Sequence, residues 1–363
     1  MAKETTEPTV VDVRIPVKGA ADGSGWEIAA TVYAVPPGTH AAAAGDGDGD
    51  GDGDGEGAGA PWAAPVLVLL PGGGYGRRYF DLPEAGYSQA AAHARRGTVV
   101  VTLDHLGTGD SSIPPMQVTT LPVVAAANHQ ALTTLLDRLR GGTLAPGVLP
   151  PLQASAVVGA GQSMGGHIAL GMQAHHRTFD GLALMGTSAV ATTLPRRPAT
   201  PAPDSDPAVP RQSRAPGAAQ GSDSPGEVDW AWGWHWVEEL CPLAKSDIEA
   251  GLPRRTEPRP WASLAIPGLA TTLMTPGVVA AEAAAVDVPV LLAAGERDVI
   301  AAPLDEIGAY TAATDVAFFR VPRMGHMHNF APTRGLLWTR LDAFVRQVAA
   351  LRARQQLDAA PAA

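Results

Sequence analysis

A short motif with a central serine constrains the fold of this chain more than any other part of its sequence. The motif is GQSMG at residues 161–165, and it lies between the apolar run 156–160 and the helix-like segment 166–172. Glycines two residues before and after Ser163 remove the Cβ atoms that would clash in a tight turn from a strand into a helix. The motif therefore predicts such a turn, with the Ser163 hydroxyl lifted clear of a sheet as a candidate nucleophile.

Short apolar runs and helical segments alternate along much of the chain. The first two runs, 10–17 and 26–35, are rich in β-forming residues and predict a leading antiparallel hairpin. Further strands are expected at 66–70, 98–103, 156–160, 181–185, 288–294 and 316–321, and helices at 87–94, 121–139, 166–172, 304–311 and 336–353. Because the strands are continuously apolar, this alternation predicts an α/β fold with a mainly parallel sheet and helices on both faces.

Composition argues against several kinds of partner. The chain has 363 residues, of which 45% are hydrophobic, and this is ample material for a large core. Its formal net charge of −10 argues against nucleic acid or an anionic membrane, because both attract clustered Lys and Arg. The sequence contains no apolar run of about 18 residues, so we expect no membrane insertion.

The cysteine content and the first residues favour a reducing compartment. Cys241 is the only cysteine, which excludes an intramolecular disulfide and zinc sites built from several thiolates. Residues 1–8 are polar and lack the apolar region of a secretory signal. We therefore expect a cytoplasmic protein.

The regular pattern is interrupted at residues 41–60, which read AAAAGDGDGDGDGDGEGAGA. Glycine at every second position and the absence of large side chains predict a flexible surface loop. The alternating aspartates also offer oxygen ligands for calcium, but their spacing lacks the pattern of an EF-hand and of nonapeptide calcium repeats. A flexible loop is therefore the favoured interpretation.

A second interruption, residues 188–285, divides the α/β pattern, so the core is predicted to comprise 1–187 and 286–363. The first half of this insertion, 192–227, is rich in proline and is expected to be disordered. The second half, 228–285, is predicted to form a tryptophan-rich cap that acts as a lid. It contains five of the eight tryptophans of the chain, namely Trp230, Trp232, Trp234, Trp236 and Trp261.

The alternating tryptophans of the cap allow two interpretations of its local structure. Their spacing would place four indoles on one face of a strand, whereas the flanking Glu238, Glu239 and Leu240 favour a helix. The rings either anchor the lid on the core or line a substrate pocket.

A serine nucleophile requires a base, because its alkoxide is scarcely populated at neutral pH. Two histidines, His326 and His328, follow the last predicted strand and should reach the same edge of the sheet as Ser163. We favour His326 as the base and expect His328 to support it or to contact the lid or the substrate. A metal site at this pair is not expected, because further ligands are not in view.

The third member of such a site is a carboxylate that orients the histidine. Asp298 lies just after the predicted strand 288–294, which gives the order Ser163, Asp298, His326. Glu296 competes for this role, but its position on the strand exit points it the opposite way, toward Arg297 or solvent. Asp298 is therefore the favoured carboxylate.

Backbone donors for an anionic intermediate are also expected. The run Gly72 to Gly74 follows a predicted strand, and its small residues let amide groups approach a ligand. We expect Gly73 to supply one donor and Met164, directly after the serine, to supply the other. A phosphate loop is a weaker interpretation, because the run lacks the Gly-Lys-Ser/Thr ending.

In this order the motifs resemble those of the α/β-hydrolase superfamily, over roughly residues 60–187 and 286–350. Residues 104–111, DHLGTGDS, are similar to the D-x-x-G-x-G-x-S turn of that family, in which Asp104 and His105 would be structural. Pro71 stands where many members carry a histidine, which leaves Gly73 or Gly74 as the second oxyanion donor. The resemblance implies a sheet of the eight-stranded type with a helical lid inserted after the sixth strand.

The resemblance and the serine together imply hydrolysis of a carboxylic ester or lactone of a hydrophobic small molecule, through an acyl-enzyme on Ser163. This chemistry requires no cofactor and no metal. The residues expected to contact the substrate are Gly74, Tyr75, Trp232, Trp236 and His328. The alternatives are a carbon–carbon bond hydrolase or perhydrolase with the same three residues, and a non-catalytic ligand-binding protein of the same fold.

Overall fold

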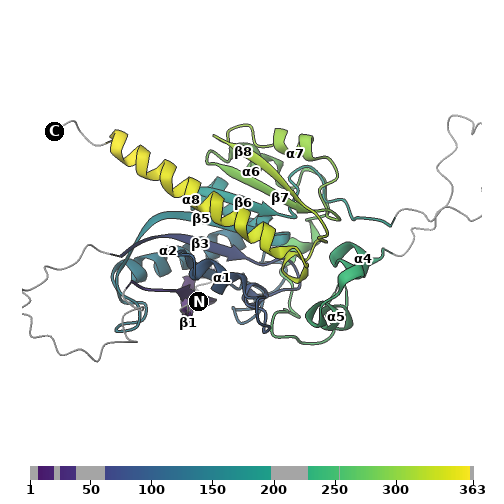
Figure 1. Cartoon of the computed structure of the whole chain (residues 1–363), viewed down its shortest axis with the longest axis horizontal. Coiled ribbons are helices and arrows are strands. Elements are labelled where there is room, and N and C mark those ends of the chain that lie inside the picture. Colours follow the sequence, from purple (N-terminus) through teal and green to yellow (C-terminus); the bar gives the residue numbers. More distant parts are fainter. Residues whose placement is uncertain (1–6, 20–24, 38–61, 198–227, 253, 360–363) are drawn as a thin grey trace, which may run out of the picture.

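The computed structural model describes residues 7–19, 25–37, 62–197, 228–252 and 254–359 (Figure 1). The predicted loop at 41–60 lies outside the described residues. Most of the segment 192–227, which was expected to be disordered, also lies outside them. These two expectations therefore stay predictions.

A single eight-stranded sheet forms the centre of the molecule, in the order β1-β2-β4-β3-β5-β6-β7-β8. β1 pairs with β2 and β2 with β4 in antiparallel fashion, and every other neighbouring pair is parallel. The strands are β1 Thr9–Lys18, β2 Gly25–Ala34, β3 Trp62–Leu70, β4 Val99–Leu103, β5 Leu152–Gln162, β6 Gly181–Met185, β7 Val290–Gly295 and β8 Val316–Val321. The predicted mainly parallel sheet and its leading antiparallel hairpin are confirmed.

Helices cover both faces of this sheet, as the sequence predicts. Helices α2 (Leu121–Arg140), α3 (Met164–His176) and α6 (Ala280–Ala285) contribute to the core on one face, while α1 (Gln89–Ala94) and α8 (Arg334–Ala359) contribute to the core on the other. Figure 1 shows α8, in yellow, crossing in front of the sheet, where it contacts β3, β5 and β6. Helix α7 (Pro303–Gly308) follows β7.

The central strands are apolar throughout because both of their faces are buried. In β3, for example, Val66 and Val68 belong to the core on the α2 and α3 side, whereas Leu67 and Leu69 belong to the core on the α8 side. All four side chains are fully buried. Successive residues of a strand point to opposite faces, so a doubly covered strand reads as a continuous apolar run.

The connection between β6 and β7 contains several short helices. Besides α6, they are α4 Trp230–Trp234, the 3₁₀ turn Val237–Glu239, α5 Pro242–Glu249 and the 3₁₀ turn Gly268–Thr271. Figure 1 shows α4 and α5 near each other at one end of the molecule, apart from the helices that cover the sheet. We call the described residues 228–252 and 254–279 the cap.

The first helix of the cap decides between the two sequence interpretations of the tryptophan stretch. The side chain of Asp229 caps α4 by accepting a hydrogen bond from the Trp232 amide at 2.9 Å. The stretch therefore forms a helix rather than a strand over these residues. Among the described residues, no helix is long and apolar enough to cross a membrane.

Candidate active site

Ser163 lies in the turn between β5 and α3. Its backbone angles are φ 53° and ψ −120°, a strained conformation for a residue with a side chain. A Cβ atom on Gly161 would lie 2.4 Å from the Gly165 carbonyl oxygen, and one on Gly165 would lie 2.1 Å from the Leu70 carbonyl oxygen. Both glycines are needed because the backbones pass too closely for any side chain, so the predicted sharp turn is present.

The structure brings Ser163, His326 and Asp298 into direct contact. His326 Nε2 lies 2.9 Å from Ser163 Oγ, and His326 Nδ1 lies 2.6 Å from Asp298 Oδ1. Because an ionised carboxylate can only accept, Nδ1 carries the hydrogen and Nε2 is free to accept from the serine hydroxyl. The side chains of His326 and Asp298 are 2% and 1% exposed, so this pair is shielded from water.

Asp298 receives hydrogen bonds on both oxygens. The Val299 amide donates to Oδ1, and the Gly295 amide and His328 Nε2 donate to Oδ2, each at 2.8 Å. Burial alone would raise the pKa of Asp298, but His326 and His328 hold it well below its usual value. Asp298 therefore stays ionised while it orients His326.

The competing carboxylate and the second histidine occupy other places. Glu296 is exposed, and its Oε2 accepts from the Arg323 amide at 2.9 Å. His328 is buried against Asp298 and does not line the cavity beside Ser163, so it supports the carboxylate rather than contacting a ligand. Within the described parts of the chain, no group of three or more His, Cys, Asp or Glu side chains could hold a metal ion.

Two residues that support His326 escaped the sequence analysis. The Gln162 side-chain amide donates to the His326 carbonyl at 3.0 Å. Gly186, at φ +58°, lies against the ion pair, and a Cβ there would come within 2.9 Å of both His326 Nδ1 and Asp298 Oδ1. The available signals were the position of Gln162 next to the serine and of Gly186 directly after β6.

The expected backbone donors lie beside the serine. Gly73 and Met164 both line the Ser163 cavity, and in the described structure their amide groups have no protein acceptor. Gly74, at φ +78°, does not line this cavity, and its carbonyl accepts from the Ser263 amide at 3.0 Å. The geometry therefore favours Gly73 over Gly74 as the second donor.

His105 anchors the start of the glycine loop, residues 71–76, from the core side. Its Nε2 lies 2.9 Å from the Pro71 carbonyl oxygen, and its Nδ1 lies 2.8 Å from Asn128 Nδ2. Burial lowers the pKa of His105 to about 4. The neutral ring therefore donates from Nε2 to Pro71 and accepts from Asn128, which is the structural role expected for it.

A largely apolar cavity of about 200 Å³ opens beside Ser163. None of its described lining residues is Asp, Glu, Lys or Arg. The lining residues are Gly73, Ser163, Met164, His167, Gly186, Thr192, Leu194, Trp230, Trp234, Ile266, Ala270, Leu273, Met274, Val299, His326 and Met327. Burial lowers the pKa of His167 to about 4, so this wall of the cavity is neutral near pH 7.

The structure corrects the expected places of two tryptophans. Trp230 and Trp234 line the cavity, whereas Trp232 and Trp236 lie over the Arg297 guanidinium, whose carbon is 4.3 and 3.8 Å from their ring centroids. Within α4, Trp230 and Trp234 are four residues apart and share one face, whereas Trp232 lies two residues from each and faces away from them. Trp236 lies beyond the end of this helix.

Tyr75 also departs from its expected role. It was expected to contact the substrate, but its side chain is fully buried and its hydroxyl donates to Asp247 at 2.7 Å. Tyr75 is absent from the cavity lining, so the structure does not place it against a substrate in this cavity.

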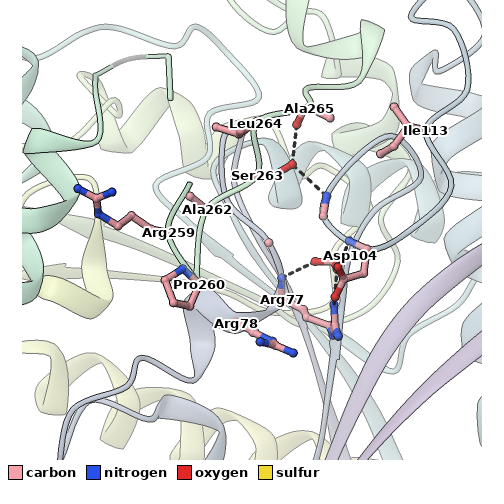
Figure 2. Close-up of a pocket in the computed structure, with 13 residues that line it drawn as sticks. Arg77, Arg78, Asp104, Ile113, Arg259, Pro260, Ala262, Ser263, Leu264 and Ala265 are labelled. Carbon is pink, nitrogen blue, oxygen red and sulfur yellow. Dashed lines mark hydrogen bonds and ion pairs between the residues drawn. The ribbon is translucent and has the colours of Figure 1, made fainter. Parts of the chain in front are cut away.

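A second hollow, of about 400 Å³, lies outside the Ser163 cavity, between Arg77 and Asp104 of the core and Arg259 to Ala265 of the cap (Figure 2). Its buried guanidinium, Arg77, is paired with Asp104 and Asp110. Asp104 also accepts from the Arg77 amide at 2.6 Å, as expected for a structural turn residue. The charge of the buried Arg77 guanidinium is thus compensated within the protein.

Comparison with known proteins identifies relatives of the fold. A sequence model of the alpha/beta hydrolase family matches residues 67–337. No curated protein matches the chain. Among solved structures, proline iminopeptidase of Mycobacterium smegmatis is similar, with 16% identity, a TM-score of 0.55, and 94% of this chain and 99% of that chain covered.

Two further structures show the same similarity of fold. One is the 2-hydroxy-6-oxo-6-phenylhexa-2,4-dienoate hydrolase of a Rhodococcus species, with 16% identity, a TM-score of 0.54, and 93% and 99% of the two chains covered. The other is a bromoperoxidase of Bacillus anthracis, with 15% identity, a TM-score of 0.54, and 93% and 100% covered. The TM-scores and coverage show that these proteins share a fold with this chain, and at such low identity they show the fold alone.

Gly186→Ala should destabilise the protein more than Gly147→Ala. Both positions have positive φ, at +58° and +75°, but a Cβ at Gly147 would meet nothing within 4 Å. We expect Gly186→Ala to lower the free energy of unfolding by about 1–3 kcal/mol more than the control, because its Cβ also presses on His326 and Asp298. Urea unfolding measures both values, and equal losses would contradict the close packing described for Gly186.

The free energy of unfolding should decrease as the pH falls from about 6.5 to about 4. The pKa of His105 is lowered to about 4 in the folded protein, so in this interval the unfolded chain binds more protons than the folded one. His105 alone can contribute a loss of up to about 3 kcal/mol across this interval. Urea unfolding at several pH values should show a shallower pH dependence for His105→Gln, and an unchanged slope would contradict the neutral buried ring.

Proposed function

Because the chain belongs to the alpha/beta hydrolase family, we propose that it is a serine hydrolase that cleaves a neutral carboxylic ester or lactone of a hydrophobic small molecule. One observation carries this proposal. A continuous chain of hydrogen bonds lies at the wall of an apolar cavity. It joins Ser163 Oγ to His326 Nε2 at 2.9 Å and His326 Nδ1 to Asp298 Oδ1 at 2.6 Å.

In the proposed reaction Ser163 Oγ attacks the carbonyl carbon of the ester while His326 Nε2 takes its proton. The tetrahedral intermediate collapses when the carbon–oxygen bond to the alcohol breaks, and His326 returns the proton to the departing alcohol oxygen. Water then attacks the acyl-enzyme with His326 again as the base. The acid leaves, and Ser163 regains its hydrogen.

Negative charge develops on the substrate oxygen and positive charge on His326 during this reaction, and the site has groups that can stabilise each charge. The Gly73 and Met164 amides are proposed to donate to the anionic oxygen, a contribution worth about 10²–10³ in rate for one such donor. Asp298 stabilises the imidazolium that forms when His326 takes the proton. Because Asp298 accepts from three further donors, it keeps its charge and its orientation throughout.

The residues that line the cavity favour a substrate without charge. Its described lining contains no Lys or Arg to receive a carboxylate and no Asp or Glu to receive an ammonium group, while Trp230, Trp234, Leu273 and others offer apolar contact. An isolated charge in such surroundings is costly. A dienoate, as in the name of the Rhodococcus neighbour, is an anion, so the cavity favours ester cleavage over that carbon–carbon hydrolysis.

Replacement of Ser163 by Ala should abolish hydrolysis of a neutral p-nitrophenyl ester. We expect a loss of at least about 10³-fold in kcat/KM, because the nucleophile is removed. Ser155→Ala, on the same strand β5, is the matched control and should retain the wild-type rate. Steady-state release of p-nitrophenol gives both values. Activity retained by Ser163→Ala would refute the proposal.

Neutral esters should be better substrates than anionic ones of similar size. We expect kcat/KM for p-nitrophenyl butyrate to exceed that for p-nitrophenyl hydrogen succinate by about 10-fold or more, because the neutral apolar wall does not solvate a carboxylate. A preference for the anionic ester would contradict the neutral substrate. Faster cleavage of a vinylogous diketone than of either ester would favour the carbon–carbon hydrolase.

A further inference from the structure

A buried carboxylate of the cap, Asp247, collects hydrogen bonds from four side chains. It lies on α5 and is fully buried. Its Oδ2 accepts from the Tyr75 hydroxyl at 2.7 Å, from Arg255 Nη2 at 2.9 Å and from His235 Nε2 at 3.0 Å, and its Oδ1 accepts from Trp261 Nε1 at 2.8 Å. Asp247 therefore joins the cap to the core through Tyr75 and joins three parts of the cap to one another.

The Tyr75 contact is one of several that fasten the glycine loop, residues 71–76, to the cap. The Gly76 amide donates to the Trp261 carbonyl at 2.9 Å, and the Ser263 amide donates to the Gly74 carbonyl at 3.0 Å. These two hydrogen bonds form an isolated antiparallel bridge between Tyr75 and Ala262. The loop that carries the Gly73 amide is thus held from the cap side at three successive residues.

The His235 contact leads to the other half of the site, the histidine loop at residues 322–328. His235 directly follows Gly233 and Trp234, whose carbonyls accept from the His326 amide at 3.0 Å and the Met327 amide at 2.8 Å. The Trp234 ring lies against the His326 ring, with 4.7 Å between centroids. The backbone next to His235 therefore sets the position of the proposed base.

Stability alone does not explain this buried cluster. Burial would raise the pKa of Asp247, but His235, Arg255 and Trp261 hold it below its usual value, so the carboxylate stays charged. Well-packed apolar residues can replace a buried ion pair with little or no loss of stability. A role in fixing geometry is better supported, because a displacement of about 1 Å in a catalytic site can cost about 10² in rate.

Building on the proposed function, we propose that Asp247 is a positioning residue that fixes the glycine loop and the histidine loop relative to each other. It touches neither Ser163 nor His326. Asp247 has two connections to the site, which we call its arms. The first arm joins Asp247 through Tyr75 to the glycine loop that carries the Gly73 amide, and the second joins it through His235 and Trp234 to the His326 ring. Two of the groups proposed to act on the tetrahedral intermediate, the Gly73 amide and His326, are thereby positioned by one side chain.

Asp247→Asn tests this role, with Asp342→Asn as the matched control. Asp342 is also a buried carboxylate that binds a histidine and an arginine, His93 and Arg96, but it joins α8 to α1 and does not line the Ser163 cavity. For a neutral p-nitrophenyl ester we expect Asp247→Asn to lower kcat about 10-fold or more while KM changes less than about 3-fold. Asp342→Asn should keep the wild-type kcat. An equal kcat in the two variants would overturn the proposal.

Hydrogen exchange provides a readout that does not depend on turnover. Peptides that contain the amides of Gly76, His326 and Met327 should exchange at least about tenfold faster in Asp247→Asn than in Asp342→Asn, because their acceptors lie in the cap. Unchanged exchange would overturn the proposal. If the wild-type protein cleaves no ester, the proposed function fails, and the exchange data still decide whether Asp247 fixes the two loops.

Tyr75→Phe and Tyr310→Phe keep the test decisive if Asp247→Asn does not fold. The first removes the hydroxyl that joins the glycine loop to Asp247 and Arg255 but leaves the His235 contact in place, and the second removes a buried hydroxyl beside Glu306, outside the cavity. We expect a lower kcat and faster exchange at Gly76 for Tyr75→Phe alone. The same kcat and exchange in the two variants would overturn the Tyr75 arm and with it the proposal.

Discussion

The 2.9 Å hydrogen bond between Ser163 Oγ and His326 Nε2 is the contact on which the proposed chemistry depends. It joins residues that are distant in sequence, and it forms because β5, β6, β7 and β8 are parallel neighbours whose carboxyl ends meet at one edge of the sheet. The turn after β5 accepts strained backbone angles at Ser163 to reach this contact. The fold therefore supplies the geometry, and burial of Asp298 and His326 keeps it free of water.

The cap completes this site as well as covering it. Its backbone carbonyls at Gly233 and Trp234 hold the histidine loop, and its residues Trp261 and Ser263 hold the glycine loop. A cap bound in this way is part of the proposed catalytic geometry, and the neutral lining to which it contributes is the reason for proposing an uncharged ester. In this proposal, one segment of the chain both selects the substrate and positions the base.

Much of the site could be predicted from the sequence because its main residues directly follow apolar strands. The order Ser163, Asp298, His326 and the parallel sheet both come from such local patterns. The places of the tryptophan side chains were harder to predict from the sequence, because a W-x-W repeat over so short a helix fits more than one periodicity. In the structure Trp232 and Trp236 lie over Arg297. The cluster around Asp247 joins segments far apart in the chain, and one sequence carries no local signal for it.

Mapping of a fluorophosphonate adduct tests the central claim most directly. The wild-type protein and His326→Ala are treated with the probe, and the labelled peptide is identified by mass spectrometry. A phosphonate on Ser163 in the wild type, formed at a rate at least about 10²-fold lower in the variant, is the predicted result because His326 activates the nucleophile. Labelling of another residue, or equal labelling of Ser163 in both proteins, would contradict the account.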